Sequence, residues 1–220
     1  MKAMILAAGR GERLKPLTVI TPKPLLMVGN TTLLGHLLHQ LRDAGIEDVV
    51  INVHHHADQM MAYAGDGSQF GLRIQYSVEE VLLETGGGIY QALPLLGCEP
   101  FLIISADIWT DYPLENLIHK KISHAHLVLV SNPDFHIMGD FNLSNEGVIQ
   151  TDFPKKFTYA SFGILHPDLF RHALPGIFRL TDVLQPAIEN GLVTGEHYQG
   201  HWHNVGTLDE LTKLRSTFMS

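Results

Sequence analysis

The sequence is poor in the features that mark disulfide-linked, basic and membrane proteins. Its 220 residues contain one cysteine, Cys98, which excludes an intramolecular disulfide and a cysteine-rich zinc module and suits a reducing compartment. Fifteen lysines and arginines stand against 23 aspartates and glutamates, so the formal net charge is -8. A surface of that sign repels phosphate backbones and anionic lipid, so we expect neither a nucleic acid nor a membrane as a partner.

Long apolar runs are absent as well. No stretch approaches the roughly 18 residues that a membrane-spanning helix needs. The opening segment MKAMILAAG carries an apolar run from Ala3 to Ala8 that is shorter than the core of a signal peptide, and we interpret it as a buried first strand. These observations predict a cytoplasmic protein.

Several catalytic motifs are missing from the sequence. GxxxxGK[ST], GxSxG and HExxH do not occur. A GxGxxG dinucleotide fingerprint would require glycine at position 14, where Leu14 stands instead. The hypothesis of an NAD-dependent oxidoreductase therefore loses its main support.

What the chain does contain is an alternation of strand-like and helix-like segments. Leucines recur at helical spacing in LLGHLLHQLRDAG, residues 33–45, and Gly45 supplies a C-terminal stop. Short apolar runs with strand character surround it, namely MILA, DVVINV, LRIQYS, FLIIS and AHLVLV. The alternation predicts an α/β fold of the Rossmann-like type, a three-layer sandwich with a mixed, mostly parallel central sheet.

From Asn132 onward polar turns separate shorter segments. GDFNL, VIQ and YASFGIL are expected to form short strands over or beside the sheet. A helix is predicted over Thr181–Asn190 and a terminal helix from about Asp209. Because no repeat or low-complexity linker interrupts the chain, we expect a single domain over residues 1–220.

A glycine-rich loop with four cations in or near it follows the first strand. Gly9 and Gly11 let the backbone turn tightly and bring its N–H groups close to a ligand, although two glycines alone would also fit a simple turn. In open α/β sheets ligands bind at the carboxyl ends of the strands, where this loop lies. On an acidic protein the local positive charge predicts an anion site, and its cations are Arg10, Arg13, Lys15 and Lys23.

The same residues resemble the signature of a known family. LAAGRGERLKPLT at residues 6–18, followed by TPKPL at residues 21–25, is similar to the sugar-1-phosphate nucleotidyltransferases. The resemblance implies a nucleotidyltransferase or glycosyltransferase-A-like fold and the transfer of a nucleotide from a nucleoside triphosphate to a sugar 1-phosphate. Arg13 would be catalytic at the leaving pyrophosphate and Lys23 at the α-phosphate, and the nucleotide would contact Leu6, Ala7, Ala8, Gly9, Arg10 and Gly11.

A second segment, LETGG at residues 83–87, resembles the family motif that contacts the nucleoside, with Glu84 in place of a glycine. The resemblance implies base and ribose contacts by Glu84, Thr85 and Gly86. The residues alone also fit a flexible turn at Gly86–Gly88 with Thr85 as a helix cap. Residues 1–131 would thus form the nucleotide-binding part of the domain, and residues 132–220 the sugar-binding and closing part.

Two oxygen ligands are candidates for a metal site. Asp107 follows the apolar run FLIIS, where a lone aspartate is more often a turn or a cap than a ligand. A triphosphate, however, carries Mg²⁺, which prefers oxygen ligands. The family resemblance implies Mg²⁺ as the cofactor, bound by Asp107 and by Asn204 of WHNVGT, where many relatives have aspartate.

Histidines are numerous, but we expect no metal site from His54, His55 and His56. Consecutive side chains on an extended chain point to opposite faces, so the three cannot easily converge on one ion.

The acceptor is the least determined part of the prediction. Length and several segments, among them GDGSQFGLRIQYS and GEHYQGHWHNVGT, resemble the short uridylyltransferases of bacterial cell-wall recycling, which implies UTP and N-acetylmuramic acid 1-phosphate as substrates. Ser161 stands at a common glycine position of that group. Candidate sugar contacts are Gly139, Asp140 and Asn142. The alternatives are a mannose-1-phosphate guanylyltransferase, another nucleotide-sugar pyrophosphorylase, or a regulatory domain that binds nucleotide without turnover; the oligomeric state is left open.

Overall fold

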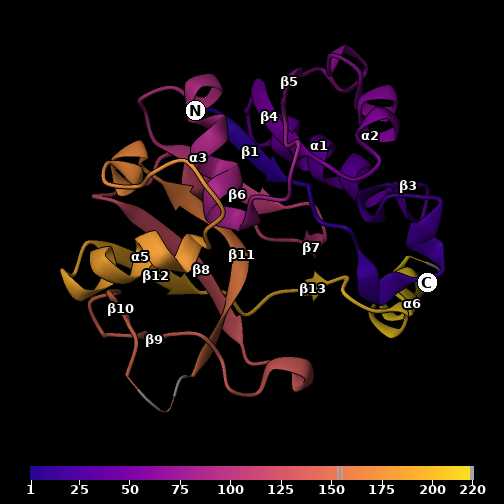
Figure 1. Ribbon diagram of the computed structural model, residues 1–220. Helices are drawn as coiled ribbons and strands as arrows, with labels where there is room; N and C mark the ends of the chain where they lie inside the picture. The colour runs from indigo at the N-terminus through magenta and orange to yellow at the C-terminus, as the bar shows by residue number, and fades with distance from the viewer. Residues whose placement is uncertain (153, 155, 219–220) are drawn as a thin grey trace.

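The computed structural model describes residues 1–152, 154 and 156–218, and a seven-stranded sheet forms its centre (Figure 1). The strand order is β12-β8-β11-β6-β1-β4-β5. Every neighbouring pair is parallel except those of β11, which is antiparallel to β6 and to β8. The predicted mixed, mostly parallel sheet is confirmed; its strands are β1 (Ala3–Leu6), β4 (Asp48–Val53), β5 (Arg73–Val78), β6 (Phe101–Ser105), β8 (Ala125–Ser131), β11 (Phe157–Leu165) and β12 (Val193–His197).

Helices cover both faces of the sheet and complete the three layers. On one face lie α1 (Leu33–Asp43), α2 (Ala57–Ala64) and α4 (Glu115–Ile118), and on the other α3 (Glu84–Leu96) and α5 (Leu180–Glu189). Successive residues of β1 point to opposite faces, so Ile5 packs in the core on the α1 side and Met4 in the core on the α3 side. Burial of these two apolar layers is the main force that holds the sandwich together.

The strand β11 differs from expectation. YASFGIL was predicted to be a short strand over or beside the sheet, whereas it belongs to a nine-residue strand between β6 and β8. Its second half, Phe162–Leu165, is buried on both sides, which only a central position provides. GDFNL and VIQ do form a separate two-stranded sheet of β9 (Asn142–Leu143) and β10 (Ile149–Gln150), as predicted.

The C-terminal helix packs against the N-terminal loop. Leu211 and Leu214 of α6 (Leu208–Thr217) share a buried cluster with Leu14 and Val28. Figure 1 shows α6 beside the indigo segment that follows β1. Two further short sheets complete the structure, β2 (Met27–Val28) with β3 (Thr31–Thr32) and β7 (Ile108–Thr110) with β13 (Trp202–Asn204).

Single-turn helices fill several connections. They span Glu12–Leu14, Leu17–Val19, Lys23–Leu25, Ser68–Phe70, Asp134–His136 and Pro167–Phe170. Among the helices in the described residues, none has the length and apolar character to cross a bilayer.

Candidate active site

The loop after β1 lines a cavity of about 240 Å³ at the carboxyl edge of the sheet. Leu6, Ala7, Ala8 and Gly9 all border it, as the sequence predicts for a nucleotide site. Gly11 does not line this cavity. It has a positive φ of 63°, and a Cβ there would lie 2.9 Å from Cγ2 of Thr18, so this glycine is required by the turn itself.

Lys23 and Asp107 lie together in this cavity. Lys23 is the first residue of the single helical turn Lys23–Leu25 and lies between Pro22 and Pro24, which are both buried. The two prolines therefore fix the direction of its backbone. Its Nζ forms a hydrogen-bonded ion pair with Oδ2 of Asp107, and the two side chains are only 15% and 19% exposed. A lysine and a carboxylate from distant parts of the chain therefore face the same small space.

Asn204 lies next to Asp107 because the short strands β7 and β13 pair. Asn204 is opposite Ile108 in the antiparallel register, and Val205 N–H donates to the carbonyl of Asp107 at 2.9 Å. The side-chain oxygen of Asn204 is buried and has no hydrogen-bond partner among the described residues. An unpartnered buried oxygen on the strand paired with the segment of Asp107 fits Mg²⁺, which takes few protein ligands and completes its shell with water and phosphate.

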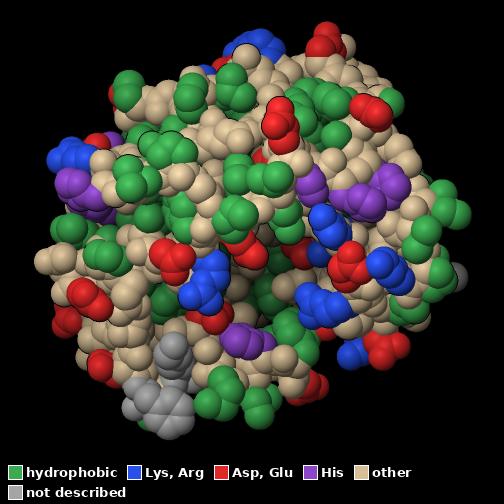
Figure 2. All heavy atoms as spheres, viewed as in Figure 1, with side chains coloured by type: hydrophobic (Ala, Val, Ile, Leu, Met, Phe, Trp, Pro, Cys, Tyr) green, Lys and Arg blue, Asp and Glu red, His purple; other side chains and the backbone are tan. Residues whose placement is uncertain are grey.

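Arg13 reaches the same region from the N-terminal loop. Its guanidinium nitrogen lies 2.9 Å from where a Cβ on Gly206 would be, so glycine at 206 makes room for it. Arg13 and Asn204 line a second cavity of about 550 Å³ that adjoins the first through Leu6, Glu84, Thr85 and Ser105. Figure 2 shows Lys and Arg side chains on both sides of the hollow in this face.

Of the three candidate sugar contacts, Asp140 alone lines the larger cavity. Its carboxylate accepts the N–H of Tyr159 at 2.9 Å and lies 3.0 Å from Nε2 of His136. Asn142 lines neither cavity: its side-chain amide donates to the carbonyls of Asp152 and Pro154, and its oxygen accepts Lys156 N–H. These three hydrogen bonds show that Asn142 braces a loop.

Gly139 is likewise a turn residue and lines neither cavity. Its φ is 62°, and a Cβ would lie 2.6 Å from the side-chain oxygen of Asn132. The glycine provides space for this close packing, and its own contacts are with the protein.

The glycines at the start of α3 are packed against protein. A Cβ on Gly86 would lie 2.5 Å from Phe178, and a Cβ on Gly87 would lie 2.2 Å from the carbonyl oxygen of Gly176. Gly86, a predicted nucleotide contact, lines neither cavity, whereas Glu84 and Thr85 line both. Thr85 is inside the helix, so the alternative reading of Thr85 as its cap is wrong.

The two positions where the family resemblance leads us to expect glycine have a left-handed backbone. Glu84 has a φ of 62° and Ser161 a φ of 63°. Ser161 lies at an irregularity of β11, where the register to β8 shifts between Tyr159 and Gly163. The chain therefore keeps the backbone shape that glycine favours although both residues have a Cβ.

Asn52 and Glu79 are site residues that the sequence analysis missed. Asn52 at the end of β4 accepts Ala7 N–H at 2.8 Å and donates to Glu79 at 2.6 Å. The other oxygen of Glu79 accepts Leu83 N–H at 3.0 Å. Both side chains line the smaller cavity and are less than 5% exposed. An asparagine inside the apolar run DVVINV was the available signal, since a buried polar side chain needs partners.

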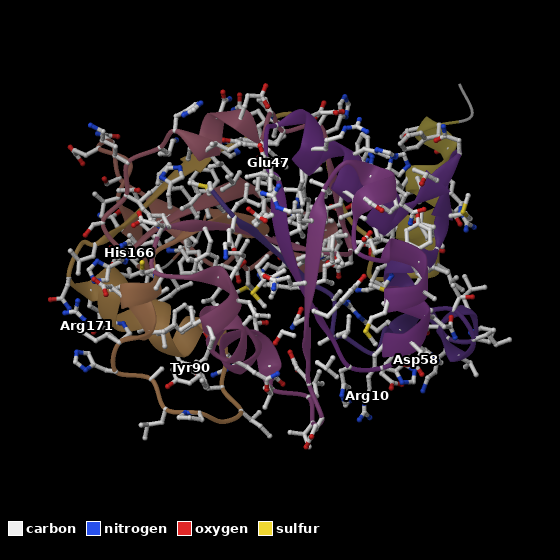
Figure 3. All side chains as sticks on the ribbon, turned by 90° about the horizontal axis from the view of Figure 1, so that it is seen from above. Arg10, Glu47, Asp58, Tyr90, His166 and Arg171 are labelled. Carbon is white, nitrogen blue, oxygen red and sulfur yellow. The ribbon has the colours of Figure 1, made fainter. Side chains whose placement is uncertain are left out.

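Arg10 and the histidine run lie away from the cavities. Figure 3 shows Arg10 projecting outward from the edge of the molecule, and it lines neither cavity. His54 bonds the carbonyl of Glu79 at 2.9 Å through Nδ1, and the rings of His55 and His56 lie 3.9 Å apart. Within the described ranges no three His, Cys, Asp or Glu side chains are grouped to hold a metal ion.

Comparison with known proteins agrees with this geometry. The sequence pattern of the nucleotidyl transferase family matches residues 2–161, and the chain belongs to this family. It is 40% identical over 98% of its length to the N-acetylmuramate alpha-1-phosphate uridylyltransferase of Neisseria meningitidis serogroup B, and 97% of that protein is covered. The enzyme of the same name from Caulobacter vibrioides is 34% identical over 93% of this chain and 91% of its own.

Solved structures show the same fold. A crystal structure described as a putative glucose-1-phosphate thymidylyltransferase from Bacillus anthracis superposes with a TM-score of 0.89 over 99% of this chain and 95% of that chain, at 22% identity. HddC from Yersinia pseudotuberculosis superposes with a TM-score of 0.83 at 18% identity, over 99% of both chains. The predicted fold class is confirmed, and so is the resemblance on which the site residues were chosen.

Proposed function

We propose that this protein transfers the uridylyl group of UTP to N-acetylmuramic acid 1-phosphate and releases pyrophosphate. The observation that carries the proposal is the 40% identity to the Neisseria enzyme, which spans 98% of this chain and 97% of that one. The arrangement of Lys23, Asp107 and the loop after β1 around one cavity supports it.

In the proposed reaction an oxygen of the acceptor's 1-phosphate attacks the α-phosphorus of UTP. As this P–O bond forms, the bond from the α-phosphorus to the bridging oxygen breaks, and its electron pair leaves with pyrophosphate. No general base is required, because a phosphate monoester with a second pKa of about 6 is largely a dianion near neutral pH. Catalysis then consists of positioning the two anions and neutralising their charge.

The proposed roles follow from where the cations and free amides lie. Ala8 and Gly9 border the smaller cavity, and their N–H groups would hold phosphate oxygens, whereas that of Ala7 is already used by Asn52. Lys23 would shift from Asp107 to the α-phosphate, and Arg13 would balance the charge of the leaving pyrophosphate.

We also propose Mg²⁺ as the cofactor, held by Asp107 and Asn204. The unpartnered oxygen of Asn204 beside Asp107 supports this assignment. The ion would supply positive charge to the phosphate oxygens. Because Asn204 carries no charge, Asn204→Asp should lower the Mg²⁺ concentration that gives half-maximal rate, and an unchanged Mg²⁺ titration would contradict its role as a ligand.

The proposed substrates place the reaction in the cytoplasm, in the recycling of cell-wall amino sugars. A second candidate is guanylyl transfer to mannose 1-phosphate, because the mannose-1-phosphate guanyltransferase of Aspergillus fumigatus is 38% identical. That similarity covers 61% of this chain and 38% of the fungal enzyme. It therefore supports the acceptor of this alternative less than the full-length relatives support N-acetylmuramic acid 1-phosphate.

A pyrophosphate-release assay tests the proposal. UTP with N-acetylmuramic acid 1-phosphate should give turnover that excess EDTA abolishes and Mg²⁺ restores, while GTP with mannose 1-phosphate should give little. Faster turnover with the second pair would favour the alternative. Nucleotide binding without pyrophosphate release from either pair would instead indicate a regulatory domain.

A further inference from the structure

The larger cavity contains an arginine that the proposed reaction does not use. Arg179 precedes α5 and lines the cavity, with its side chain 73% exposed. Its backbone is fixed against α3, because Gly87 N–H donates to the carbonyl of Phe178 at 3.0 Å and Gly86 leaves space for the carbonyl carbon of Arg179. The start of this side chain is therefore held rigidly at the cavity wall.

The other charged groups that line this cavity have partners or proposed tasks. The carboxylate of Glu210 accepts the N–H groups of Gly206 and Thr207, both at 3.1 Å, and that of Asp140 faces Tyr159 N–H and His136. Arg13 lies against Gly206 beside Asn204.

Among the described residues, the guanidinium of Arg179 has one ion pair, and it is long. Nη2 lies 3.6 Å from Oδ1 of Asp182, while the other oxygen of Asp182 accepts Arg179 N–H at 2.9 Å. Glu84 lines both cavities, and its carboxylate would repel the negative charge of an anionic ligand. Arg179 is thus a cation in the acceptor cavity with donors available for an anionic ligand.

Resting on the proposed function, we propose that Arg179 selects the acceptor by binding the carboxylate of its 3-O-lactyl ether. This carboxylate is the group that distinguishes N-acetylmuramic acid 1-phosphate from N-acetylhexosamine 1-phosphates, whose phosphate is their only charged group. A guanidinium binds a carboxylate through two parallel hydrogen bonds, which gives direction as well as charge. Figure 1 shows α5 and β13 on opposite sides of β11, and Arg179 and Asn204, from the segments at these two elements, line the same cavity.

The 1-phosphate of the acceptor is the other anion that Arg179 could bind. That phosphate must reach the α-phosphorus near Lys23 and Asp107, which line the smaller cavity, and Arg179 does not line that cavity. The geometry therefore favours the lactyl carboxylate as the group that Arg179 binds. Binding of the carboxylate and binding of the 1-phosphate predict different kinetic results.

The test compares two acceptors with UTP, N-acetylmuramic acid 1-phosphate and N-acetylglucosamine 1-phosphate, in the unmodified enzyme and in Arg179→Gln. For the lactyl acceptor the substitution should raise KM about 10- to 100-fold with kcat little changed, the loss typical of one charged hydrogen-bonded contact. For N-acetylglucosamine 1-phosphate, which lacks the lactyl carboxylate, kcat/KM should stay the same. Arg179→Lys should recover part of the lost preference, because it restores the charge without the planar fork.

Arg171→Gln is the matched control, since Arg171 is exposed, pairs with Asp168 and lies at the outer edge of the molecule (Figure 3). Arg171→Gln should leave KM and kcat unchanged for both acceptors. Equal losses for both acceptors in Arg179→Gln would assign Arg179 to the phosphate and overturn the proposal, and so would no loss with either. An unmodified enzyme that uses neither acceptor would refute the proposed function itself.

Discussion

At the scale of single residues, Lys23 and Asp107 balance each other's charge within the smaller cavity. Both side chains are more than four-fifths buried, so each charge is stabilised by the other in surroundings poor in water. Nucleotide and cation together would replace this pair by two new ones. The pair keeps the lysine and the carboxylate in the cavity before substrate arrives.

Replacing Lys23 by alanine should lower turnover by about 10²- to 10³-fold, the usual effect of removing one donor that stabilises developing charge. Pyrophosphate release measures this loss, and a thermal melt verifies folding. Lys15→Ala is the matched control in the same loop, because Lys15 is 53% exposed and pairs with Glu12 on the surface. Near-native turnover of the Lys23 variant in a folded protein would contradict its role.

Replacing Ser161 by glycine is expected to stabilise the protein. The left-handed φ of 63° at Ser161 costs a residue with a Cβ about 1 kcal/mol, which glycine avoids. Ser161→Gly should therefore raise the free energy of unfolding in a urea titration by somewhat less than this, since glycine also gives the unfolded chain more freedom. Ser161→Ala keeps the Cβ and should give no gain. A destabilised glycine variant would show that the serine side chain offsets the strain.

At the scale of elements, the chain of hydrogen bonds through Asn52 joins three segments. It links the loop after β1, the end of β4 and the loop before α3, all of which border the smaller cavity. Asn52→Leu would leave Ala7 N–H and Oε1 of Glu79 without this partner, at a cost of about 1–3 kcal/mol for each buried group.

The expected result for Asn52→Leu is a lower urea midpoint together with a raised KM for UTP. Asn30→Leu, at an exposed position, serves as the control and should alter neither quantity. If the Asn52 variant loses stability while KM for UTP is unchanged, the bridge supports the fold without shaping the nucleotide site.

Elements with a strong local pattern were predictable from the sequence, and those fixed by distant partners were not. The leucines of α1 and the apolar runs of β4 and β6 gave nearly the observed bounds, Leu33–Asp43, Asp48–Val53 and Phe101–Ser105. The place of β11 depends on pairing with strands more than 25 residues away, which local periodicity does not encode. The same holds for Gly86 and Gly87, whose packing partners belong to the segment before α5.

Within the candidate site, five predicted site residues of the two opening motifs line the smaller cavity, namely Leu6, Ala7, Ala8, Gly9 and Lys23. Arg10 and Gly11 of the same motifs line neither cavity. Lys23 and Asp107 meet as expected. The hydrogen bonds of Asn142 to a nearby loop were not predictable, because the backbone carbonyls of that loop carry no signal in the sequence.

At the scale of the whole molecule, a polar cluster away from the cavities predicts how stability depends on pH. Glu196 on β12 is bound by His126 of β8 and by Lys120 and Tyr112 from the α4 side of the sheet. The hydrogen bond from His126, with those from Lys120 and Tyr112, lowers the pKa of Glu196 to about 2 from 4.5. The ionised form is therefore favoured by folding.

Because this pKa is lower in the folded protein, the stability that Glu196 contributes is complete above pH 4.5 and is lost as pH falls toward about 2. Glu196→Gln should reduce the free energy of unfolding at neutral pH and flatten its decline across that window, as followed by urea titrations at several pH values. Glu99→Gln changes an exposed carboxylate and serves as the control. Its free energy of unfolding should fall with pH as steeply as that of the unmodified protein. An equally steep decline in both variants would refute the assignment.

The packing of α6 on the loop after β1 also has a consequence for biosynthesis. Leu14 and Val28 are translated long before their apolar partners Leu211 and Leu214. Until α6 has left the ribosome, the apolar side of the loop after β1 therefore lacks this support. Ribosome-bound fragments that end before α6 should bind UTP more weakly than fragments that include it.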